Sequence, residues 1–110
     1  METQAIPASV KSLIDAQQRH DNEAYAKCFA PNAKVFDEGR THEGYDEIKR
    51  WITDANSKYN TVMQAIDYRE NSSGGVLTAE ISGTFQGSPV VLTYHLKFDN
   101  SLISSLKITG

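Results

Sequence analysis

The run Ala33–Asp37 reads as a short strand that ends in a carboxylate shortly before Gly39. Asp37 can serve there as an ordinary turn residue, because Asp close to Gly favours chain reversal. It can equally point into a pocket, where a carboxylate can accept a proton from a bound molecule. The residues around Asp37 leave both roles open.

Four side chains near this turn, Asp37, Glu38, His42 and Glu43, are of types that bind metal ions. Their spacing matches no metal-binding motif, and successive residues of a strand face opposite ways. The glycine-containing stretch 71–75 predicts a hairpin turn with no helix after it, so it lacks the helix N-terminus that binds phosphate groups. We therefore expect neither a metal site nor a cofactor.

The cysteine and two of the histidines have simpler interpretations. Cys28 shares a helical face with Phe29 and behaves as a small buried apolar group, with no recognisable nucleophile motif around it. His20 falls at a helix end, where the helix dipole favours a cation, and His95 falls on the polar face of a strand. We assign Cys28 no catalytic role and expect both histidines at the surface.

The length of 110 residues predicts a single domain, residues 1–110, which buries roughly two thirds of the surface that its unfolded chain exposes. Fourteen acidic and eleven basic side chains give a net charge of −3 without a block of like charge. This balance favours no binding to nucleic acid or to an anionic membrane. No apolar run approaches the roughly 20 residues that cross a bilayer, and no signal-peptide pattern is present, so we expect a cytoplasmic protein.

Helical periodicity covers three stretches of the first half of the chain. Residues 7–20 carry an apolar stripe at spacings of three and four, with Pro7 suited to the first turn. Asp21 is a candidate cap for a shorter helix that ends before Pro31. A third stretch begins at Gly44 and alternates apolar and charged faces at helical spacing. Each stretch predicts a helix that packs on another layer.

The second half of the chain changes to the period of β-strands. Four strands are expected over residues 60–70, 76–86, 89–98 and 102–109, with turn residues at each junction. In the third of them Leu92, Tyr94, Leu96 and Phe98 share one face, which we expect to be buried. Helices followed by consecutive hairpin strands predict an α+β domain with its helices on one face of an antiparallel sheet.

The stretch YAKCFAPNAKVFDEGRTHEGYDEIKRWI, residues 25–52, is similar to a family pattern. A helix ending in Phe-Ala, a strand ending near an acid, a glycine turn and a Gly before an Ile-Lys-Arg-aromatic helix resemble the nuclear transport factor 2-like superfamily, specifically its SnoaL-like branch. The order of elements agrees over nearly the whole chain. The resemblance implies a cone-shaped, cystatin-like roll, in which three N-terminal helices pack on a curved antiparallel sheet and close a cavity.

The resemblance also implies roles for particular residues. Asp37 falls where ketosteroid isomerases carry their general base, and a partly desolvated carboxyl group there would have a raised pKa. The two enolate-stabilising positions of those enzymes correspond to Leu13, which donates nothing, and approximately to Tyr94, which offers a phenol. We therefore expect Asp37 as base and Tyr94 as hydrogen-bond donor. The residues expected to line a cavity for a small apolar molecule are Leu13, Tyr25, Val35, Trp51, Leu92 and Leu96.

Two alternatives remain open. Tyr25 and Tyr94 lie on apolar stripes, where aromatic residues usually belong to the core. The family also includes modules without chemistry, so the chain is either an isomerase-like or polyketide-cyclase-like enzyme, or a non-catalytic binding or dimerisation module whose cavity its own side chains fill. The family further implies a homodimer through the outer face of the sheet, where we place Val62, Ile66 and Val91.

Overall fold

The computed structural model describes residues 6–37, 39–71 and 74–110. Within these described residues, three helices and six strands follow one another. They are α1 (Ala8–Arg19), α2 (Asn22–Lys27), β1 (Phe29–Asp37), β2 (Arg40–Glu43), α3 (Gly44–Tyr59), β3 (Val62–Asn71), β4 (Gly74–Ser82), β5 (Val90–Asp99) and β6 (Leu102–Thr109). The expectation of three helices before the sheet is wrong in part, because α3 follows the β1–β2 hairpin and α2 is only 6 residues long.

The strands form one sheet in the order β2-β1-β6-β5-β4-β3. All neighbouring pairs are antiparallel except β1 and β6, which run parallel. The prediction of an antiparallel sheet is therefore wrong at this junction. Consecutive strands of a meander alternate in direction, whereas β1 meets β6 only after α3 and three further strands, so turn chemistry does not set their relative direction.

Three element boundaries differ from the expected ones. Strand β1 begins at Phe29 and runs past Pro31. The strand tolerates this proline because a register shift after the pairing of Phe29 with Ile103 leaves Pro31 exposed and unpaired with β6. Strand β2 was not expected, since its four residues show no apolar alternation. Strand β4 ends at Ser82 rather than residue 86, and the connection that follows includes a cis peptide bond before Pro89.

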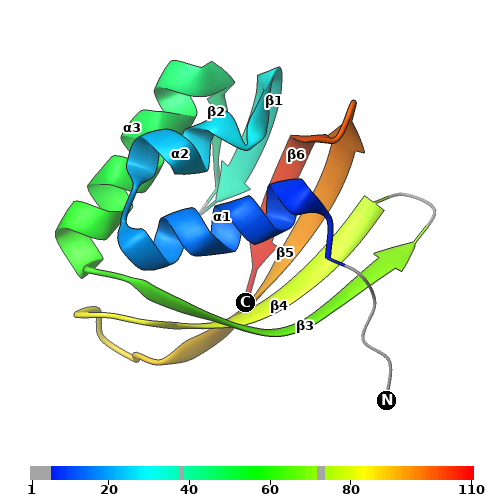
Figure 1. Ribbon diagram of the computed structural model, residues 1–110. Helices are drawn as coiled ribbons and strands as arrows, with labels where there is room; N and C mark the ends of the chain where they lie inside the picture. The colour runs from blue at the N-terminus through cyan, green and yellow to red at the C-terminus, as the bar shows by residue number, and fades with distance from the viewer. Residues whose placement is uncertain (1–5, 38, 72–73) are drawn as a thin grey trace.

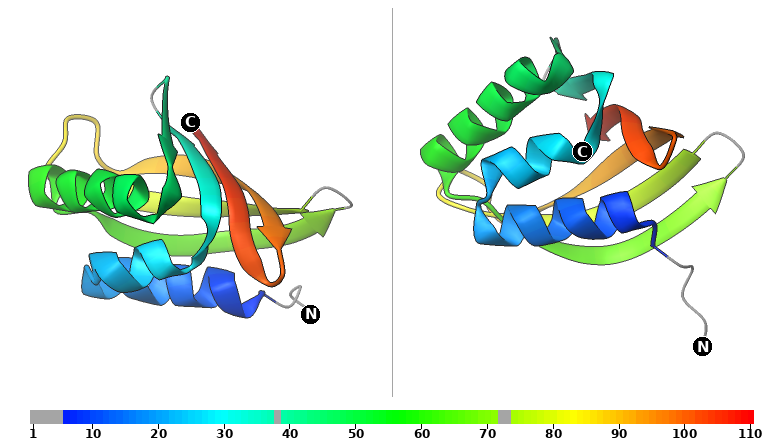
Figure 2. Two further views of the ribbon diagram at one scale, coloured as in Figure 1. Left: turned by 90° about the horizontal axis from the view of Figure 1, so that it is seen from above. Right: turned by 45° about the horizontal axis from the view of Figure 1, so that its top comes forward.

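All three helices lie on the same side of the sheet (Figures 1 and 2). Helix α1 packs against β3 and touches β6, while α3 packs on β1 and β2. Figure 1 shows β3 and β4 curving beneath the helices and β1 and β2 standing beside α3. The sheet thus bends around the helical layer. Among the described residues, no helix is both long enough and apolar enough to span a bilayer.

The register of β5 agrees with the expected parity. Tyr94 and Leu96 are buried and Leu92 and Phe98 are half-buried, whereas Val91 and His95 are exposed. Strand β4 shows the same alternation, and Leu77 is fully buried opposite Tyr94. A sheet with one covered face requires this pattern, because a slip of one residue would turn every apolar side chain to solvent.

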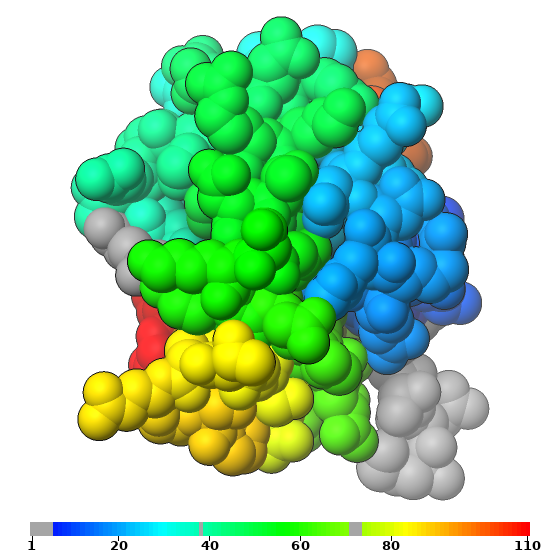
Figure 3. Space-filling model, turned by 90° about the vertical axis from the view of Figure 1, so that its left-hand side faces the viewer, coloured from blue at the N-terminus to red at the C-terminus, as the bar shows by residue number. Residues whose placement is uncertain are grey.

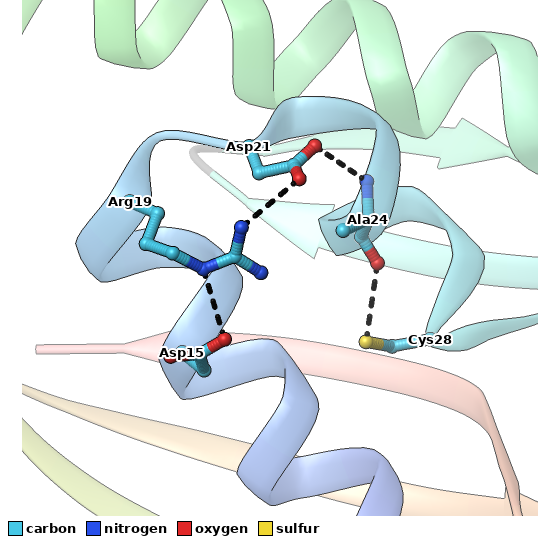
Figure 4. A network of polar contacts seen from close by, with 5 residues as sticks. All are labelled: Asp15, Arg19, Asp21, Ala24 and Cys28. Carbon is cyan, nitrogen blue, oxygen red and sulfur yellow. Dashed lines mark hydrogen bonds and ion pairs between the residues drawn. The ribbon is translucent and has the colours of Figure 1, made fainter.

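The corner between α1 and α2 is held by short polar contacts (Figure 4). The Asp21 carboxylate accepts a hydrogen bond from the backbone N–H of Ala24 at 3.1 Å, which confirms Asp21 as the cap of α2. The Arg19 guanidinium donates to both Asp15 and Asp21, at 2.9 and 3.3 Å. The thiol of Cys28 donates to the Ala24 carbonyl at 3.4 Å. These contacts fix the direction of α2 and therefore the position of Tyr25 on it.

The outer face of the sheet keeps several large apolar side chains in solvent. Val62, Ile66 and Val91 are 54%, 58% and 51% exposed. A register shift between Ala65 and Asp67 in β3 leaves Ile66 without a paired residue in β4. Apolar side chains at this exposure are candidates for contact with another chain.

Candidate active site

A cavity of about 490 Å³ lies between the helices and the sheet. Its apolar wall is built mainly by Ile52, Ile81, Val90, Leu92 and Ile108. Its aromatic lining is formed by Tyr25, Trp51, Tyr59, Phe85 and Tyr94. Among the described lining residues, Asp37 carries the only charged side chain. The cavity therefore suits a small molecule that is mostly apolar and offers it one side-chain carboxylate.

Asp37 is half-buried at the end of β1, where the chain turns into β2. Its partner in the hairpin register is Arg40, and Gly39 takes a φ of 75° in the turn between them, a conformation that suits glycine. Asp37 thus closes a turn and also lines the cavity. Its carboxylate oxygen Oδ2 accepts a hydrogen bond from the indole N–H of Trp51 at 3.2 Å.

Trp51 is held in place by rings on two sides. The His42 ring stacks on the indole with centroids 5.7 Å apart and an interplanar angle of 30°. The Tyr25 ring lies 6.1 Å from the indole centroid at a tilt of 56°. Residues 48 and 52 of α3 are buried in the core, so the helix presents Trp51 toward β1 and β2. This packing orients the indole N–H toward Asp37.

Two buried phenols accompany the carboxylate. Burial raises the pKa of Tyr94, and the negative charge of Asp37 raises it further. Burial likewise raises the pKa of Tyr25 well above 10, with smaller contributions from Tyr94, Cys28 and Asp37. These effects indicate that the Asp37 carboxylate and the phenols of Tyr25 and Tyr94 are close enough to interact electrostatically. Both phenols are protonated at neutral pH, as tyrosine ordinarily is, and can donate hydrogen bonds.

A second polar group was not foreseen from the sequence. Gln17 of α1 and Thr61 line the cavity, and Asn56 of α3 lies behind them. The Gln17 amide donates to Asn56 at 2.9 Å and to Thr61, while the Thr61 hydroxyl donates to Asn56. The Asn56 amide in turn donates to Gln17 and to Asn22. Every side-chain donor of Gln17, Asn56 and Thr61 is thus engaged within the protein.

The helical pattern contained a signal for this network. Gln17 follows Leu13 by four residues, and Asn56 follows Ile52 by four, so each amide stands on the buried stripe of its helix. A polar residue on such a stripe requires a partner in the interior. Two amides on facing helices satisfy each other.

The structure separates the expected lining residues into two groups. Tyr25, Trp51 and Leu92 line the cavity together with Asp37 and Tyr94. The other three, Leu13, Val35 and Leu96, are at most 2% exposed and pack in the core, and the cavity lining does not include them. They lie on the correct faces of their elements, but neighbouring side chains cover them.

The remaining candidate groups have structural surroundings. Burial raises the pKa of the Cys28 thiol to about 11, so it is protonated at neutral pH. His95 is exposed and contacts Thr109 at 3.1 Å, as its strand parity predicted, whereas His20 is half-buried against the Thr61 carbonyl. Glu38, beside the turn, lies outside the described residues. Within the described ranges, no three His, Cys, Asp or Glu side chains are arranged to hold a metal ion.

The fold and this cavity define an α+β protein in which a curved sheet and three helices enclose a candidate ligand site. A crystal structure of a "putative polyketide cyclase" from Sinorhizobium meliloti matches it with a TM-score of 0.92 and 32% identity, over 99% of this chain and 100% of that chain. The chain belongs to the nuclear transport factor 2-like superfamily, in its SnoaL-like branch. No protein-family model and no curated protein sequence matches the chain.

More distant structures share the fold. A protein from Catenulispora acidiphila with a ketosteroid isomerase-like fold, solved in complex with trimethylamine, has a TM-score of 0.85 and 18% identity, over 96% of this chain and 87% of that chain. A nuclear transport factor 2-like protein of unknown function from Cytophaga hutchinsonii has a TM-score of 0.78 and 17% identity, over 99% and 93%. At these identities the likeness shows the fold alone.

Absorbance at 295 nm tests the protonation of the two phenols. Tyr25→Phe and Tyr94→Phe should each leave the phenolate signal of the folded protein unchanged up to pH 11, because neither group ionises there in the native state. The unfolded chain releases these protons near pH 10, so the stability that they contribute is present below pH 10 and is lost as the pH rises above it. The midpoint of urea unfolding should fall over the same range. If either folded variant gave a weaker phenolate signal at pH 11 than the unmodified folded protein, the tyrosine that it lacks would ionise in the native state, which would contradict its raised pKa.

A double-mutant cycle tests the amide network. Gln17→Leu and Asn56→Leu should each destabilise the fold by about 1–3 kcal/mol, because each leaves buried polar partners unsatisfied. The double variant should cost less than the sum of the two, since both partners of the pair are then removed. Urea unfolding followed by circular dichroism measures all four proteins. Strict additivity would show that the two amides do not interact.

Proposed function

We propose that the chain is a small-molecule enzyme that transfers a proton at carbon, in the manner of an isomerase or a polyketide cyclase. The observation that carries this proposal is the convergence of one carboxylate, Asp37, and two neutral phenols, Tyr25 and Tyr94, on a single largely apolar cavity. A base beside hydrogen-bond donors is the combination that enolate chemistry requires. The similarity to the Sinorhizobium meliloti protein described as a "putative polyketide cyclase" supports the same class.

The first step belongs to Asp37. Its carboxylate removes a proton from a carbon next to a carbonyl. The electron pair of the broken C–H bond forms the C=C bond of an enolate, and the π electrons of the carbonyl move to its oxygen. The Trp51 N–H donates to Oδ2 of this carboxylate and so fixes the orientation in which it meets the substrate. In an isomerase the carboxylic acid then returns the proton to another carbon. In a cyclase the enolate carbon attacks a second carbonyl, whose π electrons move to its oxygen, and the alkoxide that forms takes the proton from the carboxylic acid.

The second requirement is a stabilised enolate oxygen. A phenol donates a hydrogen bond only while it is protonated, as Tyr25 and Tyr94 are at neutral pH, and burial raises the pKa of both phenols further above neutrality. Two donors in a water-poor cavity stabilise developing charge better than one. Tyr25 was expected only to line the ligand site, and its place beside Tyr94 gives the proposed reaction its second donor.

The proposed ligand is a small, mostly apolar carbonyl compound. Aliphatic and aromatic walls provide the burial, and no nucleic acid, membrane, metal ion or cofactor is part of the proposed reaction. The amide network at Gln17 and Thr61 contributes shape rather than new hydrogen-bond donors, because its side-chain N–H and O–H groups are engaged within the protein.

One observation favours a second function, that of a non-catalytic binding module. The Trp51 N–H donates to Asp37, and a hydrogen bond to a carboxylate stabilises its ionised form and makes it a weaker base. In a pure binding protein this contact would serve to anchor the β1–β2 hairpin. The two functions differ in whether Asp37 is needed for turnover or only for structure.

Deuterium exchange into model ketones distinguishes the two functions. The protein is incubated in D₂O with a panel of small cyclic ketones, and label at the carbon next to the carbonyl is followed by NMR. Asp37→Asn should lower enzyme-dependent exchange by about 10²–10⁴-fold, the typical contribution of a positioned base, while the melting temperature changes little. Asp99→Asn, an exposed acid at the end of β5, is the matched control and should keep full activity.

Equal exchange by the native and Asp37→Asn proteins would remove Asp37 as the base. Trp51→Phe adds a further comparison, because it keeps an aromatic ring and loses the N–H. It should reduce exchange less than Asp37→Asn does. If it abolishes folding instead, the contact serves the hairpin rather than the reaction.

We further propose that the chain forms a homodimer through the outer face of the sheet. The support is the exposure of Val62, Ile66 and Val91 on that face. A stable interface of ordinary size buries about 800 Å² on each partner, and apolar side chains near its centre contribute most.

Light scattering at about 50 μM tests this proposal at a concentration where a standard interface persists. The native chain should give twice the mass of 12.2 kDa, and Ile66→Lys combined with Val91→Lys should give the monomer mass. Ser57→Lys, on the exposed side of α3, adds a similar charge elsewhere and should leave the dimer intact. A native monomer, or a dimer that survives both outer-face lysines, would contradict the proposed interface.

A further inference from the structure

The rim of the cavity continues into two neighbouring hollows, and all three are lined by Asp37. An outer groove of about 440 Å³ lies between β2 and α3 and shares Trp51, Ala55 and Tyr59 with the cavity. A smaller hollow of about 270 Å³ lies between the β1–β2 hairpin and β6. Figure 3 looks onto this side of the molecule, where α3, in green, runs down the middle, with β2, in teal, on its left and the segment 83–87, in yellow, below.

The rim carries several charged side chains, whereas the cavity is mainly apolar. Arg40 lines both outer hollows, Lys58 lines the groove, and Lys107 lines the smaller hollow. The carboxylates on the same surfaces are Asp37 and Asp54. Among the described residues, Arg40 and Lys58 face Asp37 and Asp54 in the groove, and Lys107 adds a third cation in the smaller hollow, although the whole chain has a net charge of −3.

The three rim cations make no ion pair with another side chain in the parts of the chain that the structure describes. The Lys58 ammonium lies 5.1 Å from the Tyr59 ring centroid, and Tyr59 lines both the groove and the cavity. The side chains of Arg40, Lys58 and Lys107 can thus meet a group that emerges from the cavity.

We propose that the ligand of this site is an amphiphile whose uncharged part fills the cavity and whose single carboxylate binds on the rim at Arg40 and Lys58. This inference rests on the proposed function, because it names the second half of the same ligand. A guanidinium matches a carboxylate with two parallel hydrogen bonds, and an ammonium adds a point charge. Asp37 and Asp54 on the same rim disfavour a doubly charged phosphate, so one negative charge fits better than two.

A pair of probes of nearly equal shape isolates the charge. Naphthalene-2-acetate carries a fused aromatic body and one carboxylate, and its primary amide is the uncharged counterpart. Both are titrated into the intact protein by calorimetry at low salt. Each exposed ion pair is worth about two- to fivefold in affinity, so the acid should bind about 5- to 20-fold more tightly than the amide. The ratio should shrink toward one at 0.5 M salt, because screening weakens exposed charge pairs.

Variants that each remove one positive charge show which residues cause the preference for the acid over the amide. Arg40→Gln and Lys58→Gln should each reduce the acid-to-amide ratio by about two- to fivefold while leaving amide affinity unchanged. The double variant should bring the ratio near one. Lys11→Gln, which removes an exposed cation of α1 that lines none of the three hollows, is the matched control and should keep the native ratio. Naphthalene-2-phosphate is the third probe and should bind no more tightly than the acid.

The outcomes separate this inference from the function on which it rests. Binding of acid and amide with equal affinity, or tighter binding of the amide, overturns the anionic ligand and leaves the apolar cavity intact as a binding site. A native preference for the acid that survives in the Arg40→Gln, Lys58→Gln double variant overturns the assigned residues. If the phosphate binds more tightly than the acid, the proposal that the ligand carries only one negative charge is wrong. If none of the probes binds, the cavity does not accept such ligands, and both the proposed function and this inference are wrong.

Discussion

The parallel pairing of β1 with β6 is the contact on which the rest of the site depends. Val35 pairs with Leu106, and both are fully buried, so the end of β1 is anchored to the last strand of the meander. This anchor brings Asp37 to the cavity that β5 and α3 also line. Without it the β1–β2 hairpin would be attached to the fold only through α3, and the carboxylate would have no fixed relation to Tyr94.

The cavity sets the chemical character of the groups around it. Removal of water destabilises a phenolate more than a phenol, so the apolar walls that accept a ligand also raise the pKa of Tyr25 and Tyr94. The same removal raises the energy of a carboxylate, and the indole N–H of Trp51 offsets part of that cost for Asp37. Packing and reactivity are therefore linked, because one apolar enclosure determines the pKa of the phenols and the need for a donor at the carboxylate.

The sequence predicted what depends on neighbouring residues and missed what depends on distant ones. The parity of β5 and the Asp21 cap follow from spacings of two and three residues, and the structure confirms both. The direction of β1 relative to β6 and the contact between Gln17 and Asn56, 39 residues apart, depend on how the sheet closes. The six expected lining residues show the same limit. Periodicity selects the inward face but does not show that Leu13, Val35 and Leu96 lie beneath other side chains while Tyr25, Trp51 and Leu92 reach the cavity.

The hydrogen bonds that Gln17, Asn56 and Thr61 make with one another make one part of the cavity lining chemically different from the rest. A carbonyl oxygen placed against this part of the wall would lose its water and find no free side-chain donor among the three, whereas Tyr25 and Tyr94 present phenol donors elsewhere in the lining. A molecule that enters with its ends reversed is therefore penalised, even if its shape fits equally well. Discrimination between the two orientations of one ligand thus arises partly from hydrogen bonds that the protein makes only with itself.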